Sequence, residues 1–194
     1  MDRKKSRHLY QIKITLKGSK PPIWRRLLIH SDIELDLFHH AIQYAMGWWN
    51  SHLHQFEKEG ILYGMIDDEF DDDFSLELED EKQYRLSDLL KWEKDSLIYE
   101  YDFGDDWRHI VTLEKILPFD PSSEVAKCLK GKMSCPPEDC GGIWGYENLL
   151  EIIKDPAHAE HEEMLEWLDG DFDPEHFDLT ETNETLSRHI KQNA

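Results

Sequence analysis

Alternation of apolar and polar residues marks the first structural element of the chain. Between His8 and Lys17 every second position is apolar, at Tyr10, Ile12, Ile14 and Leu16. This is the spacing of a strand with one buried face. Residues 18–22 are typical of a loop and residues 23–30 of a second strand, so we expect the chain to open with an antiparallel hairpin.

The periodicity becomes helical after Ser31. Ser31 precedes Glu34 by three residues, which is the spacing of a capping box. Apolar residues then recur at helical intervals, at Leu35, Phe38, Ile42, Ala45 and Met46. Gly47 occupies the position of a C-terminal cap, so the sequence predicts a helix that ends there.

Further strands follow the helix. Strand-like patterns occupy residues 51–57 and 61–66, and a short helical turn is expected at residues 86–90. The strongest hairpin signal lies at residues 97–113, where two aromatic and β-branched runs flank a Gly-Asp-Asp turn at 104–106. A three-residue loop would give the pairs Phe103–Trp107, Asp102–Arg108, Tyr101–His109, Tyr99–Val111 and Leu97–Leu113.

Helical patterns dominate the last third of the chain. One amphipathic helix is marked by Tyr146, Leu149, Leu150 and Ile153, and a second by His161, Met164, Leu165 and Leu168. Asp155-Pro156 and Asp173-Pro174 are cap-plus-proline signals for helix starts. A final, weaker helix carries Leu186 and Ile190.

These elements predict one α+β domain over residues 1–194. Residues 8–117 supply an antiparallel or mixed sheet of β-hairpins plus one helix, residues 118–143 a loop rich in Cys, Pro and Gly, and residues 144–191 a C-terminal helical segment. Two strands, a helix and then more strands is a β-grasp-like order.

Composition restricts the classes of function. No window holds 18 uncharged apolar residues, so a membrane span is not expected. Three cysteines, an odd number, do not suggest a disulfide framework, and we expect a cytoplasmic protein. A net charge of −20 argues against nucleic-acid binding. The segment from Arg3 to Arg26 is basic and leaves nucleic-acid contact open as an alternative. The simpler expectation is that it offsets acidic neighbours within the fold.

Residues 67–73 hold six acidic residues around one Phe. Such a run is usually a solvated loop. Dense carboxylates also suit Ca²⁺, but the run lacks the spacing of an EF-hand loop. We therefore expect a solvated acidic loop rather than a specific calcium site.

Histidines provide the first candidate metal site. If His52 and His54 lie on a strand, they project from one face with Cα atoms about 6.6 Å apart. His109 could supply a third nitrogen, and Asp102 or Asp105 a carboxylate, which would resemble a catalytic metal site with an open position. The competing interpretation is a set of half-buried aromatic residues with local hydrogen bonds.

Cysteines and acids provide two further candidates. Cys128, Cys135 and Cys140 lie within 13 residues and could bind zinc, although their spacing is not that of a zinc knuckle, and they could equally be small apolar residues of a packed loop. Glu138 and Asp139 precede a helix start, where acids satisfy free amides or act as an acid–base pair. Phosphate-loop, nucleophile-elbow and dinucleotide motifs are absent from the sequence.

The chain resembles the plasmid pRiA4b ORF-3-like family from about Leu9 to Leu186, in motifs at residues 22–26, 51–56, 101–109, 135–146 and 172–178. The resemblance implies one domain, an association with plasmids and mobile elements, and no assigned activity. A resolvase-like role, a label given to some members, would need an activated serine among arginines, and this acidic chain shows no such constellation.

Two functions follow as hypotheses. The first is a non-enzymatic module that contacts a protein partner. The chain holds more aromatic residues than its core obviously needs, for example Trp48, Trp49 and Trp144. The alternative is a metal-dependent hydrolase or nuclease, with zinc as the candidate metal. It would use the three histidines with carboxylates drawn from Asp102, Asp105, Glu138 and Asp139.

Overall fold

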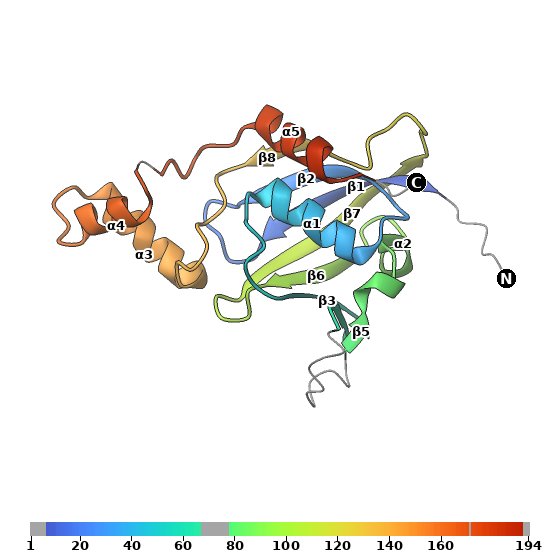
Figure 1. Cartoon of the computed structure of the whole chain (residues 1–194), viewed down its shortest axis with the longest axis horizontal. Coiled ribbons are helices and arrows are strands. Elements are labelled where there is room, and N and C mark those ends of the chain that lie inside the picture. The colour runs from blue at the N-terminus through green and yellow to red at the C-terminus, as the bar shows by residue number, and fades with distance from the viewer. Residues whose placement is uncertain (1–6, 67–77, 171, 192–194) are drawn as a thin grey trace.

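A mixed eight-stranded sheet organises the protein (Figure 1). The computed structural model describes residues 7–66, 78–170 and 172–191. The strands follow the order β5-β4-β3-β6-β7-β1-β2-β8, and only β4 and β5 pair in parallel. Their bounds are β1 His8–Leu16, β2 Trp24–His30, β3 His54–Lys58, β4 Ile61–Gly64, β5 Leu78–Asp80, β6 Ser96–Tyr101, β7 Trp107–Pro118 and β8 Ala126–Lys132.

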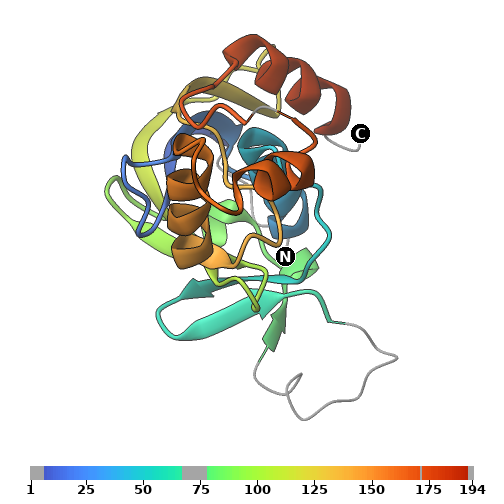
Figure 2. The same ribbon diagram turned by 90° about the vertical axis from the view of Figure 1, so that its left-hand side faces the viewer.

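Helices lie on one face of the sheet and at one end of it. α1 crosses the face, α5 packs against β8 and α1, and α3 and α4 stand together beyond the end of the sheet (Figures 1 and 2). The helices are α1 Leu35–Met46, α2 Leu86–Leu89, α3 Gly142–Lys154, α4 His161–Trp167 and α5 Leu179–His189, with a 3₁₀ turn, η2, at Glu81–Gln83. The predicted α+β class and C-terminal helical segment are confirmed.

The core forms between α1 and the sheet. Ile12 and Ile14 of β1 and Phe38 and Ile42 of α1 are fully buried, as their spacing predicts. Gly47 ends α1 with a positive φ of 99°, a conformation that glycine adopts without steric cost. The predicted capping box is wrong: α1 begins after Glu34, which makes no side-chain cap, and the Ser31 hydroxyl accepts a hydrogen bond from the His8 amide instead.

The predicted register of the central hairpin is wrong by two residues. Tyr101 pairs with Trp107 and Glu100 with Arg108, so the connection is the five residues 102–106. Asp102 causes the difference, because its φ is 57° and its carboxylate accepts hydrogen bonds from two amides of the turn, which ends β6 at Tyr101. Because the register differs by an even number of residues, each side chain stays on the face of the sheet predicted for it.

Other element boundaries differ from those that the sequence predicts. The predicted loop at 118–143 contains strand β8, which extends the sheet beyond β2, and the strand predicted at 51–57 begins only at His54. Asp173-Pro174 starts no helix; the carboxylate of Asp178 caps α5 by accepting the amides of Thr180 and Glu181. The acidic run at 67–73 lies outside the described residues.

The three described arginines of the basic N-terminal segment have partners within the fold. Arg7 pairs with Asp32 at 2.8 Å and Arg26 with Glu114 at 2.6 Å. Arg25 is buried and donates hydrogen bonds to the carbonyls of Ala45 and Lys132. This pattern fits the expectation that these cations offset acidic neighbours. Among the described helices, none has the length and apolar character needed to cross a membrane.

Candidate functional site

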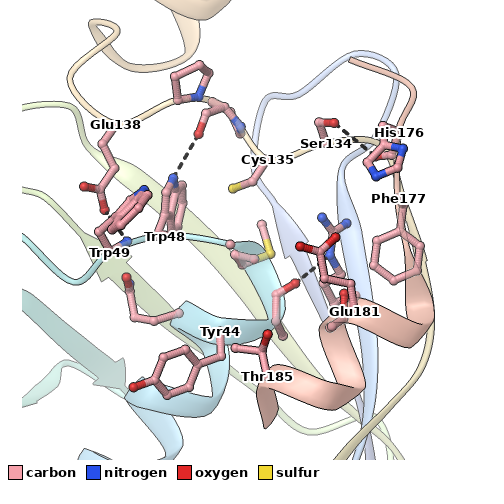
Figure 3. Close-up of a pocket in the computed structure, with 18 of the residues that line it drawn as sticks. Tyr44, Trp48, Trp49, Ser134, Cys135, Glu138, His176, Phe177, Glu181 and Thr185 are labelled. Carbon is pink, nitrogen blue, oxygen red and sulfur yellow. Dashed lines mark hydrogen bonds between the residues drawn. The ribbon is translucent and has the colours of Figure 1, made fainter. Parts of the chain in front are cut away.

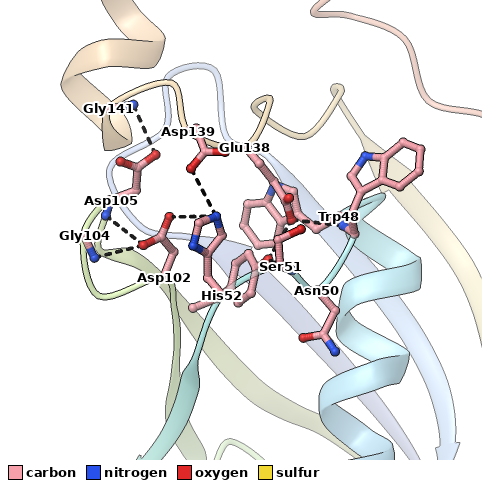
Figure 4. A network of polar contacts seen from close by, with 12 residues as sticks. Trp48, Asn50, Ser51, His52, Asp102, Gly104, Asp105, Glu138, Asp139 and Gly141 are labelled. Carbon is pink, nitrogen blue, oxygen red and sulfur yellow. Dashed lines mark hydrogen bonds and ion pairs between the residues drawn. The ribbon is translucent and has the colours of Figure 1, made fainter.

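Three loops meet at the end of the β6–β7 hairpin (Figure 4). We call residues 47–53, 102–106 and 136–141 the loop junction. Glu138 joins two of these loops, because one carboxylate oxygen accepts hydrogen bonds from the Trp49 amide at 3.0 Å and the Tyr101 hydroxyl at 2.6 Å. The Tyr101 hydroxyl in turn accepts from the Ser51 amide at 2.9 Å. Burial and the bond to Glu138 raise the pKa of Tyr101, which keeps its hydroxyl protonated.

Asp105 ties the turn of the hairpin to the start of α3. Its carboxylate accepts a hydrogen bond from the Gly141 amide at 3.1 Å. Asp105 and Glu138 therefore use their carboxylates to hold the loops together. They are structural members of the loop junction.

His52, Asp102 and Asp139 form a cluster in the middle of the loop junction (Figure 4). The Nε2 atom of His52 lies 3.1 Å from Oδ1 of Asp139 and 3.6 Å from Oδ2 of Asp102. The other oxygen of Asp102 accepts the amides of Gly104 and Asp105 at 2.9 and 3.3 Å, which fixes the carboxylate with one oxygen toward His52. Within the described parts of the chain, this is the one group of three potential ligands that lie within 4.8 Å of one another.

The other two predicted histidines lie elsewhere. His52 precedes β3, so the prediction that it shares a strand face with His54 is wrong. His54 contacts Glu81 at 2.8 Å through Nε2 and stacks on His39 with ring centroids 3.4 Å apart. His109 is fully buried beside Trp48, and burial lowers the pKa of its imidazole to about 4. His109 is therefore part of the packed interior, and His54 is a half-buried residue held by Glu81 and His39.

The three cysteines are free thiols. Cys128 is buried in β8, whereas Cys135 and Cys140 lie in the loop that leads to α3. Burial raises the pKa of all three, that of Cys140 to about 12. The described residues hold no cysteine in a three-ligand cluster, so the predicted zinc site gains no support from the geometry.

A groove of about 1090 Å³ adjoins the loop junction (Figure 3). It runs between the end of α1, residues 134–138, and the chain from α4 into α5. Its walls combine aromatic and acidic side chains, among them Tyr44, Trp49, Phe177, Glu138 and Glu181. Arg25 also lines the groove, but its guanidinium stacks over Phe177 and donates to backbone carbonyls. The groove therefore presents a negative, aromatic surface.

Large apolar side chains are exposed around the loop junction. Trp49 is 86% exposed and Trp144, in the first turn of α3, is 83% exposed; Leu53 and Phe103 are also exposed. Trp48 differs from the expectation, because it is buried and donates its indole N–H to the Pro136 carbonyl. Tyr44 and Glu181 are not predicted as site residues, since no local sequence pattern reveals that α5 folds back beside α1. In the sequence, only the motif at 172–178 indicates that this part of the chain contributes to a site; several of its residues line the groove.

Replacing Tyr101 by Phe tests how the loop junction is held. We expect the free energy of unfolding to fall by about 1–2 kcal/mol, because the Ser51 amide and the Glu138 carboxylate lose a shared partner. Urea denaturation measures this loss. Tyr84→Phe is the control, because it removes a hydroxyl that bonds to Glu79 at the surface and keeps the half-buried ring, and it should change stability by less than about 0.5 kcal/mol. Equal losses in the two variants would contradict this role of Tyr101.

The fold and the site together define a class: an α+β protein with an acidic, aromatic-rimmed loop junction at one end of a mixed sheet. Residues 8–181 match the family described as plasmid pRiA4b ORF-3-like protein, and the chain belongs to that family. The expected resemblance is thereby confirmed.

Two relatives extend this assignment. An uncharacterised protein, y4hQ of Sinorhizobium fredii, is 34% identical over 177 residues, which cover 91% of this chain and 89% of y4hQ. The crystal structure of MM3350, a protein of unknown function from Methanosarcina mazei Go1, is 41% identical and has a TM-score of 0.81. That similarity covers 91% of this chain and 98% of MM3350. Neither relative carries a stated activity.

Proposed function

We propose that this protein is a binding module that recognises a cationic protein segment at the loop junction and the adjoining groove. The observation that carries the proposal is the exposure of Trp49, whose amide bonds to Glu138 within the loop junction, and of Trp144, in the first turn of the helix that follows it. Exposed aromatic patches rimmed by polar groups are typical of contact surfaces. Their indole rings also suit cation–π contacts with Arg or Lys.

Charge supports the choice of partner. The whole chain has a net charge of −20, and Asp102, Asp105, Asp106 and Glu138 all belong to the loop junction, with Glu181 in the groove. A segment that carries Arg or Lys beside an apolar residue would be attracted by the carboxylates and would cover the exposed rings. Such long-range attraction raises the association rate and weakens with salt.

The family description names a plasmid reading frame, which supports a link to plasmid-borne or mobile genes. Direct nucleic-acid contact through residues 3–26 is less favoured, because Arg7, Arg25 and Arg26 already have partners in the fold. A hydrolase that uses all three predicted histidines is disfavoured, since His54 is held by Glu81 and His39 and His109 lies in the interior.

Selection from random 12-residue peptides tests the proposal. We expect enrichment of Arg or Lys beside aromatic or aliphatic residues, and binding of the selected peptide that weakens with salt. Trp49→Ala and Trp144→Ala should each reduce the affinity at least about 10-fold, as measured by calorimetry. Trp92→Ala is the matched control, because Trp92 is 59% exposed in the connection before β6, at the end of that strand opposite the loop junction. Equal losses for Trp92→Ala, or enrichment of acidic peptides, would contradict the proposal.

A further inference from the structure

We propose that His52, Asp102 and Asp139 form a binding site for one divalent transition-metal ion. This inference does not rest on the proposed contact function. It begins with the arrangement of three electron-rich atoms around one point, where Nε2 of His52 lies 3.1 and 3.6 Å from the two carboxylate oxygens. Metal bonds of about 2.0–2.2 Å place neighbouring ligand atoms about 3–3.5 Å apart. The two separations from His52 are close to that spacing, and all three ligand atoms lie within 4.8 Å of one another.

The environment of His52 provides a second, independent observation. Its Nε2 atom is shielded from solvent and makes no hydrogen bond within the described residues, although two carboxylate oxygens lie close by. Buried polar atoms are almost always satisfied, by protein groups or by a bound water or ion. An imidazole nitrogen whose lone pair faces two carboxylates is repelled by them. A cation bound between the three groups removes that repulsion and gives Nε2 a partner.

The chain holds the proposed ligands in place without using up their donor atoms. Asp102 binds the turn amides through Oδ1 and leaves Oδ2 directed at His52. Glu138 and Asp105 bond to Trp49, Tyr101 and Gly141, so they support the loops around the site. Such outer contacts orient ligands and strengthen metal binding.

The donor set selects the class of ion. One imidazole nitrogen with two carboxylate oxygens suits Mn²⁺, Fe²⁺ or Zn²⁺, whereas Ca²⁺ and Mg²⁺ prefer oxygen ligands alone. Three protein ligands leave at least one position for water or another ligand. Asp139 is 71% exposed at its side chain, so that position is open to solvent.

Calorimetric titration of the untagged, chelator-treated full chain with Zn²⁺ or Mn²⁺ tests the site. We expect one equivalent to bind, and neither Mg²⁺ nor Ca²⁺ to compete at equal concentration. His52→Ala and Asp139→Asn should each weaken binding at least about 100-fold, more than loss of an outer contact does. Asp139→Asn is the safer variant, because the side chain is exposed and Asn tolerates the φ of 58° at this position.

Two control variants separate this site from other acidic or thiol sites. Asp106→Asn removes an exposed carboxylate of the same turn, paired with Arg108, and should change the affinity less than twofold. Cys135→Ser should also change the affinity for the metal ion less than twofold. Absence of stoichiometric binding would overturn the proposal. Equal loss in Asp106→Asn or Cys135→Ser would also overturn it. This titration contains no peptide. Absence of metal binding would therefore not contradict the contact function, which the peptide selection tests.

Discussion

Gly145→Ala should lower the free energy of unfolding by at least about 3 kcal/mol. Gly145 lies in α3, and a Cβ atom there would come within 1.8 Å of the Cys140 carbonyl oxygen. The carbonyl belongs to the backbone and the position of a Cβ atom is fixed by its own backbone, so neither group can rotate away. The loop at 136–141 would have to move from the start of α3, which would disturb the loop junction as well as the fold.

Urea denaturation measures this effect through its midpoint and slope. Glu151→Ala is the matched control, because it adds no atom and lies on an exposed position of the same helix. We expect Glu151→Ala to remain within about 0.5 kcal/mol of the natural chain. A stability of Gly145→Ala within about 1 kcal/mol of the natural chain would show that the loop and the helix are not packed as described.

Mild acid should destabilise the protein, by about 2 kcal/mol for each of two buried histidines between pH 7 and pH 5. Burial lowers the pKa of His39 to about 2 and that of His109 to about 4. Both side chains stay neutral in the fold, whereas the unfolded chain takes up protons below about pH 6.5. The unfolded state therefore binds more protons in this window, and stability falls as the pH falls.

Comparison of pH profiles isolates this contribution. His109→Phe should remove about half of the change in unfolding free energy between pH 7 and pH 5, whatever its own stability at pH 7. His158→Asn, at an exposed position, should leave the profile unchanged. Carboxyl groups with lowered pKa values, such as Glu114 and Asp95, lose their contributions in more acidic solution, below the ordinary pKa of such groups. A profile of His109→Phe parallel to that of the natural chain would contradict burial of a neutral imidazole.

Local periodicity was sufficient for the parts of the fold in which one element buries one face. β1, α1 and the C-terminal helices follow directly from the spacing of their apolar residues. Register and edge strands depend on contacts distant in sequence. The turn at Asp102 ends β6 two residues early because of one side chain's hydrogen bonds, and β8 forms because β2 offers it an edge.

The candidate site also depends on contacts between residues that are distant in sequence. The sequence predicts His52, Asp102 and Asp139 as candidate residues but groups them with His54 and His109. Only the topology brings the loops at 47–53, 102–106 and 136–141 together. Likewise, tryptophan content suggested a contact surface without distinguishing the buried Trp48 from the exposed Trp49 and Trp144.

Indole N–H resonances of the tryptophans report whether a partner binds at the loop junction. The seven tryptophans each give a separate indole N–H signal, assignable through Trp→Phe variants. On addition of the selected cationic peptide, we predict that the signals of Trp49 and Trp144 shift while that of Trp92 stays in place. A shift of Trp92 with Trp49 and Trp144 unchanged would place binding elsewhere and contradict the account.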